Sequence, residues 1–577
     1  MRKNRGTPVL ALLLSVILVF GLTGCSAVAD ELDKVSGLLR SAADNEKNTG
    51  GQTEPAETAK PIESEAPSAS AEAPVTDPAP ETPSSAAPEP PAPESVALLG
   101  VNYGIANKSV PFTEGDWSRI AARTEFVQFA LDRDFTGDYP QLDAALYYWS
   151  KGINETYMAW VEEAAAEMKS APGADQAASP AAYRTLLGTV VRADTSIVSL
   201  LCSAESYRFG AAHPDYGYQT AAFDPASGKP LALSDVLKDR AGFLARVGEE
   251  LNAQYGKDSF FSDVKEMVGG MADEDLVWTA DNGGVTLYFN PYILAPFAEG
   301  EFVVTIPYAG NENLFADRLT ARPASYTAVQ GTMPGIRDDV TGDGIPEAIT
   351  VTLDDHGMYD DVSGDVHVHI NDKDYTVWTG DSLGRKTAVV HPGNGRSYLY
   401  IINAGYNGWD CLVTVDVTGG GATYVKEEYL SLPVLEDGDL VWAYEQAIAR
   451  PEHFYLSHVT DALSSNNAIG VYRAGADGAP ELTSPWYELQ YFHRLTIKAE
   501  VTVKTVDNDG KVTGEKTLAP GDEIILYRTD DKTWVDAWLN DADGTMVRIF
   551  ADLENWPLTL EDGRPASDVF DGMMFAG

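Results

Sequence analysis

The pattern of hydrophobic and polar positions divides the chain into an N-terminal part and a folded part. Val9–Leu22 is a short apolar run, and residues 45–95 contain no aromatic side chain. From about residue 96 onward, apolar side chains recur at every second position or at intervals of three and four. These periods are typical of half-buried strands and of amphipathic helices. Roughly 480 residues are too many for one hydrophobic core, so we expect several domains.

The middle of the chain mixes the two periods. After Pro140, a helix is predicted whose apolar face carries Leu146, Trp149, Ile153, Tyr157, Trp160 and Val161. Further segments alternate as strands: Tyr183–Leu187, Thr189–Asp194, Ile197–Ser206, Val285–Phe289 and Phe302–Pro307. Strands and helices without regular alternation predict an α+β fold over residues 96–325, with an antiparallel sheet and packed helices.

The C-terminal half is predicted to be mostly β. Val366–Ile370, Tyr398–Ile402 and Leu412–Asp416 alternate in strand fashion and are bounded by Gly, Asn and Asp. A last run of strands falls between Thr496 and Phe550. We expect a β-rich domain over residues 332–490 and a small β domain over residues 491–577, which resembles an SH3-like barrel in outline.

The N-terminus has the pattern of a lipoprotein signal peptide. Basic residues precede the apolar run, and Leu22-Thr23-Gly24-Cys25 has the form of a lipobox. Cleavage before Cys25 would leave its thiol to carry diacylglycerol, which predicts a lipid anchor on the extracellular face of a bacterial membrane. The alternative is an uncleaved membrane helix, but the run is short for a span of about 20 residues. Residues 26–95 then form a stem and a disordered linker rich in Pro, Ala, Glu and Ser.

Charge and cysteine content narrow the possible partners. The formal net charge is −46, and it argues against nucleic acid because phosphate binding needs clustered Lys and Arg. An acidic surface favours cationic partners, although solubility alone also explains it. Apart from Cys25, only Cys202 and Cys411 occur, 209 residues apart, and we expect two buried free thiols.

The densest set of oxygen ligands lies at residues 338–347, Asp-Asp-Val-Thr-Gly-Asp-Gly-Ile-Pro-Glu. Side chains at alternate positions can point inward, Gly344 allows a sharp turn, and a backbone carbonyl can complete the ring. The predicted Ca²⁺ ligands are Asp339, Thr341, Asp343, the carbonyl of Ile345, and Glu347. The sequence that follows reads as a strand, so the loop resembles the calcium loops of FG-GAP repeats more than an EF-hand. A plain Asp-Gly turn is the alternative interpretation.

Two stretches of the middle domain resemble a known family. The first is YRFGAAHPDYGYQTAAFDPASGKPLALSDVL, from Tyr207 to Leu237, and the second is GVTLYFNPYILAPFAEGEFVVTIPY, from Gly284 to Tyr308. They are similar to the motifs of the domain of unknown function 3298, found in RsiV-type anti-sigma factors and in the N-terminal region of PdaC-type deacetylases. Upstream, YPQLDAALYYWSKGINETYMAWVEEA resembles the 4163-like module that usually precedes this domain. One departure is Gly210-Ala211 in place of the first Gly-Gly pair.

The resemblance implies a binding role, since the RsiV type suggests a lysozyme receptor. His213, Tyr216 and Tyr218 are the candidate ligand-binding residues in the first stretch. No nucleophile elbow, His-Glu-x-x-His motif or second histidine accompanies His213, so we do not expect catalysis there. The sequence therefore favours a lipid-anchored surface protein that binds a cell-wall component, such as peptidoglycan, or a lysozyme-like protein. Two alternatives stay open: an enzyme of cell-wall glycan turnover, and a structural or adhesive protein with Ca²⁺-stabilised β domains.

Overall fold

The computed structural model describes residues 96–329, 335–355, 363–381, 384–404, 410–437, 442–445, 448–540 and 544–575. The predicted signal peptide, the lipobox with Cys25 and the linker of residues 26–95 lie outside the described residues. Among the described residues, no helix is both long enough and apolar enough to cross a membrane.

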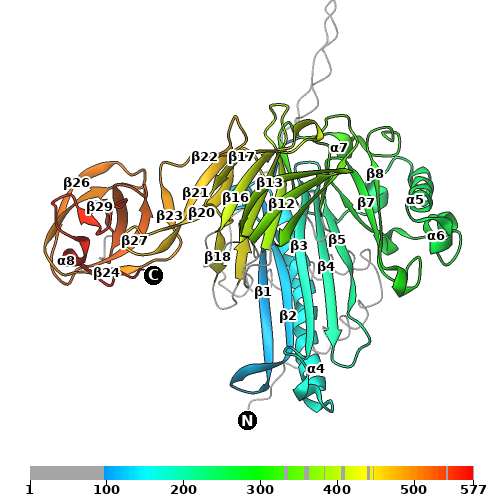
Figure 1. The fold of residues 1–577 in the computed structure, drawn as a ribbon, viewed down its shortest axis with the longest axis horizontal. Coiled ribbons are helices and arrows are strands. Elements are labelled where there is room, and N and C mark those ends of the chain that lie inside the picture. The colour runs from blue at the N-terminus through cyan, green and yellow to red at the C-terminus, as the bar shows by residue number, and fades with distance from the viewer. Residues whose placement is uncertain are drawn as a thin grey trace, which may run out of the picture. The chain divides into compact units, whose positions relative to one another are not determined.

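The first sheet carries a long helix (Figure 1). In the described part of the chain its strand order is β18-β19-β1-β2-β3-β4-β5. All neighbouring pairs are antiparallel except β2 and β3, which are parallel. The elements are β1 (Val101–Thr113), β2 (Asp116–Leu131), α3 (Arg133–Thr136), α4 (Pro140–Ser170), β3 (Ala182–Ala193), β4 (Val198–Arg208), β5 (Asp215–Phe223), β18 (Val434–Asp437) and β19 (Trp442–Glu445).

Helix α4 forms where the apolar spacing predicted a helix. Leu142, Leu146 and Tyr157 are buried on its inner face, where they belong to the same core as Phe129 and Leu200 of the sheet. The proline at the first helical position fits there because it has no N–H to leave unbonded.

One expected strand boundary is wrong. We predicted separate strands on either side of Gly188, but β3 runs through this residue without a break. A Cβ atom at Gly188 would lie 2.7 Å from the side chains of Phe129 and Val127. The glycine therefore marks a close approach of aromatic packing to the backbone, and not a turn.

A second, smaller sheet in the middle domain has the order β6-β7-β8 and is packed by short helices (Figure 1). Its core includes Phe243 and Val247 of one helix together with Leu287 and Val304 of the sheet. The elements are α5 (Arg240–Tyr255), α6 (Val264–Gly269), β6 (Val277–Ala280), β7 (Gly284–Phe289), β8 (Phe302–Pro307) and α7 (Asp317–Thr320).

The next region consists of two antiparallel sheets that share one core, to which both Val368 and Leu399 contribute. Their strands are β9 (Tyr326–Val329), β10 (Ile336–Asp338), β11 (Glu347–Asp355), β12 (Ser363–Ile370), β13 (Lys373–Asp381), β14 (Gly384–His391), β15 (Tyr398–Ala404), β16 (Cys411–Asp416) and β17 (Thr423–Glu428). The following hairpin, β18 and β19, leaves this region and pairs with β1 through Tyr103 and Glu445.

The C-terminal strands form one further sheet, which is continuous across residue 490 because β23 pairs with both β21 and β27. Its elements are β20 (Phe454–Thr460), β21 (Asn466–Ala474), β22 (Pro480–Leu482), β23 (Tyr487–Leu489), β24 (Arg494–Ile497), β25 (Val501–Val506), β26 (Val512–Leu518), β27 (Glu523–Thr529), β28 (Trp534–Leu539), β29 (Met546–Asp552), β30 (Thr559–Leu560), α8 (Ala566–Val569) and β31 (Phe570–Asp571). The predicted class, α+β followed by a mostly-β C-terminal region, is confirmed.

Both expected thiols are free and buried. Burial raises the pKa of Cys202, and burial together with the Glu427 carboxylate raises the pKa of Cys411 to about 12. Neither thiol is therefore set up to react as a thiolate.

Candidate functional site

The two stretches that resemble the family motifs meet in the structure. The first stretch contains β5, and the second contains β7, β8 and the connection between them. Asn290 joins them, because its Oδ1 accepts the N–H of Tyr218 at 2.7 Å and its Nδ2 donates to the carbonyl of Tyr218 at 3.1 Å. A Cβ atom at Gly217 would lie 3.0 Å from the Asn290 side chain, so a larger residue would press on this contact.

Four aromatic rings gather at this junction, and we call them the aromatic platform: His213, Tyr216, Tyr292 and Phe297. Phe297 is the central ring. His213 stacks on it at 3.9 Å between centroids with an interplanar angle of 22°, while Tyr216 and Tyr292 contact it at 5.4 Å and 5.5 Å.

The platform is open to solvent. Tyr292 is 61% exposed and Tyr216 is 37% exposed, His213 is also exposed, and Phe297 is half-buried. Exposed aromatic side chains that are ordered by one another are typical of surfaces that bind sugars or protein partners. Tyr292 has a φ of 70°, a left-handed conformation that is uncommon for a tyrosine and is often associated with functional positions.

The third predicted residue, Tyr218, lies beneath the platform. It is 8% exposed, packs against Tyr288 at 5.0 Å between ring centroids, and donates its hydroxyl to Glu301 at 3.3 Å. Burial, reinforced by the Glu301 carboxylate, raises the pKa of Tyr218 and also that of Tyr216. Tyr218 therefore supports the platform, whereas His213 and Tyr216 form part of its surface.

The platform has acidic surroundings. Asp215 and Glu299 are exposed on the two segments, and Glu301 accepts the hydroxyl of Tyr218. The ring of His213 donates Nδ1–H to the carbonyl of Pro214 at 2.8 Å, so Nε2 is the ring atom that can accept a hydrogen bond from a ligand. Aromatic faces flanked by carboxylates can hold a sugar ring with its hydroxyls, or a cationic side chain.

The predicted calcium loop is closed by its own hydrogen bonds. The two carboxylate oxygens of Asp339 accept the N–H groups of Gly342 at 2.7 Å and Gly344 at 2.9 Å. Glu347 accepts the N–H of Val340 at 3.0 Å and the hydroxyl of Thr341 at 3.1 Å. Both carboxylates are buried, so the loop is pre-folded around the positions expected to act as ligands.

The remaining predicted ligands are more open. Thr341 and Asp343 are exposed, and Ile345, whose carbonyl was expected to complete the ring, is 60% exposed. Arg322 lies 3.6 Å from Asp339, where it would compete with a cation. Among the described residues, no group of three or more His, Cys, Asp or Glu is placed to hold a metal ion. The predicted ligand set also includes the main-chain carbonyl of Ile345 and the hydroxyl of Thr341, which are not side chains of these four types. Ca²⁺ binding therefore stays a prediction.

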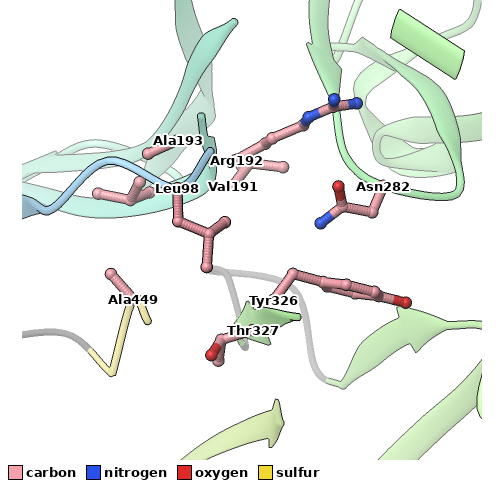
Figure 2. A pocket seen from close by; sticks show the side chains of 9 residues that line it. Leu98, Val191, Arg192, Ala193, Asn282, Tyr326, Thr327 and Ala449 are labelled. Atoms are coloured by element: carbon pink, nitrogen blue, oxygen red, sulfur yellow. The ribbon is translucent and has the colours of Figure 1, made fainter. Parts of the chain in front are cut away.

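A cavity lined by residues of β3 and β9, among others, is too small for an organic ligand. It has a volume of about 20 Å³, and the side chains of Arg192, Asn282 and Tyr326 line it, as Figure 2 shows. That volume is enough for about one water molecule.

Sequence reasoning missed half of the platform. Tyr292 and Phe297 belong to the second family-like stretch, whereas all three predicted ligand-binding residues lie in the first. The signal for Tyr292 and Phe297 was two aromatic residues in a connection that contains two prolines and has no strand or helix period that demands burial. The contact of Phe297 with His213 joins positions about 80 residues apart and follows only from the fold.

Comparison with known proteins finds a similarity that covers β7, β8 and the connection between them. The family model described as "Protein of unknown function (DUF3298)" matches residues 234–309. A solved member of the DUF3298 family from Bacteroides fragilis is 16% identical, with a TM-score of 0.31, covering 39% of this chain and 96% of its own. A DUF3298 family protein from Pseudomonas aeruginosa is 18% identical, with a TM-score of 0.26, covering 39% of this chain and 97% of its own. A search of curated proteins found no match. The match to the DUF3298 model, residues 234–309, includes the positions of Tyr292 and Phe297.

Proposed function

We propose that this chain is a lipid-anchored surface protein that binds a cell-wall component or a lysozyme-like protein through the aromatic platform. The observation that carries the proposal is the exposed stack of His213, Tyr216 and Tyr292 around Phe297. Solvent-facing rings cost hydration free energy unless a ligand covers them, and ordered rings lose little entropy on binding.

The location follows from the N-terminal pattern. The lipobox at Leu22–Cys25 supports an anchor on the extracellular side of a bacterial membrane, and residues 26–95 would act as a spacer. Both expected ligands, peptidoglycan and lysozyme, belong to that compartment.

The charge of the chain supports the protein ligand in particular. A chain with a net charge of −46 steers a basic muramidase toward itself at low salt, and the carboxylates beside the platform extend that attraction to the binding surface. We propose that the platform acts by binding, with no reaction at His213.

The test is a calorimetric titration of the full chain with a c-type lysozyme and with solubilised peptidoglycan fragments, at low and at physiological salt. A cationic protein of matched charge serves as the control. Saturable binding of one ligand that persists at physiological salt, and is absent for the control, is expected. Binding of neither ligand, or equal binding of the control, would overturn the proposal.

A further inference from the structure

A larger cavity lies at the turn between β14 and β15. The residues that line it come after residues 234–309 in the sequence. Its volume is about 310 Å³, in the range of small-molecule sites. Residues that line it include Arg322, Tyr326, Thr341, His391, Arg396 and Ser397. None of them belongs to the aromatic platform.

Two side chains that line this cavity, Ser397 and His391, form a continuous hydrogen-bonded chain with the buried carboxylate of Asp338 behind them. Ser397 Oγ lies 3.1 Å from His391 Nδ1, and His391 Nε2 contacts a carboxylate oxygen of Asp338. Asp338 is 3% exposed and Ser397 is 6% exposed. His391 ends β14, Ser397 directly precedes β15, and Asp338 ends β10, so rigid elements place all three.

The surroundings fix the orientation of the imidazole. The ring of Tyr326 stacks on that of His391 at 4.2 Å with an interplanar angle of 21°. The hydroxyl of the same tyrosine donates to the second oxygen of Asp338 at 3.2 Å. Backbone pairing of Tyr326 with His391 across β9 and β14 holds both residues in register. The histidine ring therefore has one preferred plane, and the carboxylate that contacts it is held at both oxygens.

The proton positions follow from this geometry. An ionised carboxylate only accepts hydrogen bonds, so His391 carries its hydrogen on Nε2. The lone pair of Nδ1 then faces the hydroxyl of Ser397, which donates to it. This is the arrangement in which an imidazole can take the proton of a serine while a buried aspartate stabilises the resulting imidazolium. In the best-known serine hydrolases Nε2 faces the serine and Nδ1 faces the aspartate, whereas here the two nitrogens are exchanged. The exchange does not change the chemistry, because the serine needs only a lone pair and the aspartate needs only an N–H.

We propose that Ser397, His391 and Asp338 form a nucleophilic site that hydrolyses short-chain carboxylic esters. Ser397 Oγ attacks the carbonyl carbon and its proton passes to His391 Nδ1. The bond to the leaving alcohol breaks, and the alkoxide takes the proton back from His391. Water then attacks the acyl-serine, again with His391 as base, and releases the carboxylic acid and free Ser397.

The cavity contains groups that can stabilise the negative charge on the carbonyl oxygen. Arg322 and Arg396 both line it, and their side chains are 33% and 55% exposed, so a ligand can reach their N–H groups. Each guanidinium is also near one carboxylate, that of Asp339 at 3.6 Å and that of Asp416 at 3.1 Å. These pairs use part of the donor set of each arginine and leave other N–H groups for the substrate.

The experiment uses the full chain, a fluorophosphonate probe and p-nitrophenyl acetate. We expect the probe to label Ser397, identified by peptide mass spectrometry, and ester hydrolysis to fall at least 100-fold in Ser397→Ala and in His391→Ala. Ser457→Ala is the matched control, because Ser457 is also buried but pairs with another serine, Ser431, at 3.0 Å and not with a histidine. This control should retain full labelling and hydrolysis.

A second pair of variants separates chemistry from folding. Ser397→Cys keeps the size of the side chain, and its thiol should react with iodoacetamide at least tenfold faster than the same variant carrying His391→Ala. Asp338→Asn should lower the rate of ester hydrolysis strongly. Circular dichroism should show that this variant remains folded. Absence of labelling at Ser397 in the wild-type chain, with hydrolysis no faster than in Ser397→Ala, would overturn the proposal. The cluster would then only hold the turn between β14 and β15.

Discussion

Truncation of the central ring tests whether the platform is a binding surface. In Phe297→Ala, three ring contacts are lost, with His213, Tyr216 and Tyr292. Aromatic pairs contribute about 0.5–1.5 kcal/mol each beyond area burial, and the half-exposed position places the sum toward the low end, about 2 kcal/mol. If the contacts serve mainly to order the rings for a ligand, that loss corresponds to a roughly 30-fold weaker affinity.

The assay is calorimetric titration of wild-type and Phe297→Ala chains with the ligand that binds in the titration proposed above. Trp117→Ala is the control, since Trp117 is a 63% exposed aromatic residue on β2 outside the platform. We expect its affinity to stay within twofold of the wild type. Circular dichroism and thermal unfolding should show that both variants remain folded. Equal affinity of Phe297→Ala and the wild type would refute the reasoning, and so would an equal loss in Trp117→Ala.

Three further predictions concern a buried ion pair, a buried carboxyl group and the predicted calcium loop. Arg192 forms a buried ion pair with Asp194 at 2.6 Å and donates to the Leu319 carbonyl at 2.8 Å. Arg192→Ala should therefore lower the free energy of unfolding, measured in urea, by about 3–5 kcal/mol, and a loss below 1 kcal/mol would contradict this. Burial, with a further contribution from the charge of Asp338, raises the pKa of Asp281 to about 6, above its value in the unfolded chain. The unfolding free energy of the wild type, relative to that of Asp281→Asn, should therefore fall by about 3 kcal/mol as the pH rises from about 4 to 6. Above pH 6 this difference should stay level. A pH-independent difference in unfolding free energy between these two chains would exclude that titration. If the loop binds Ca²⁺, a concentration ten times Kd should raise the unfolding free energy by about 1.4 kcal/mol in the wild type and in the exposed control Asp372→Asn, but not in Asp339→Asn; an equal response of all three chains would place the ion elsewhere.

Much of the fold could be predicted from local pattern. Helix α4 follows directly from the spacing of Leu146, Tyr157 and Val161, and β7 and β8 follow from alternation and from the family-like motif. Gly188 was misjudged because a glycine in a strand signals either a turn or a close contact, and only the position of Phe129 decides between them. The pairing of β19 with β1 joins residues more than 300 positions apart, and no local signal announces it.

The candidate sites divide in the same way. His213 and Tyr216 could be proposed as candidates from the sequence because they lie inside one contiguous motif. Tyr218, two positions further along the same strand, was expected beside them, but the ring of Tyr288 covers it. No sequence motif predicted the hydrogen-bonded chain of Ser397, His391 and Asp338, because its members lie at the ends of β14 and β10 and directly before β15, and they meet only when these strands assemble. Sequence periodicity predicts elements, whereas convergence of side chains from distant elements requires the fold.

Hydrogen–deuterium exchange of the full chain, with and without saturating lysozyme or peptidoglycan fragments, tests the central claim most directly. The amides of residues 213–218 and 290–301 should become more protected when the ligand is bound, while those of α4 and of β25–β29 should not change. Protection confined to other segments, with exchange at these two segments unaltered at saturation, would contradict the assignment of the aromatic platform as the binding surface.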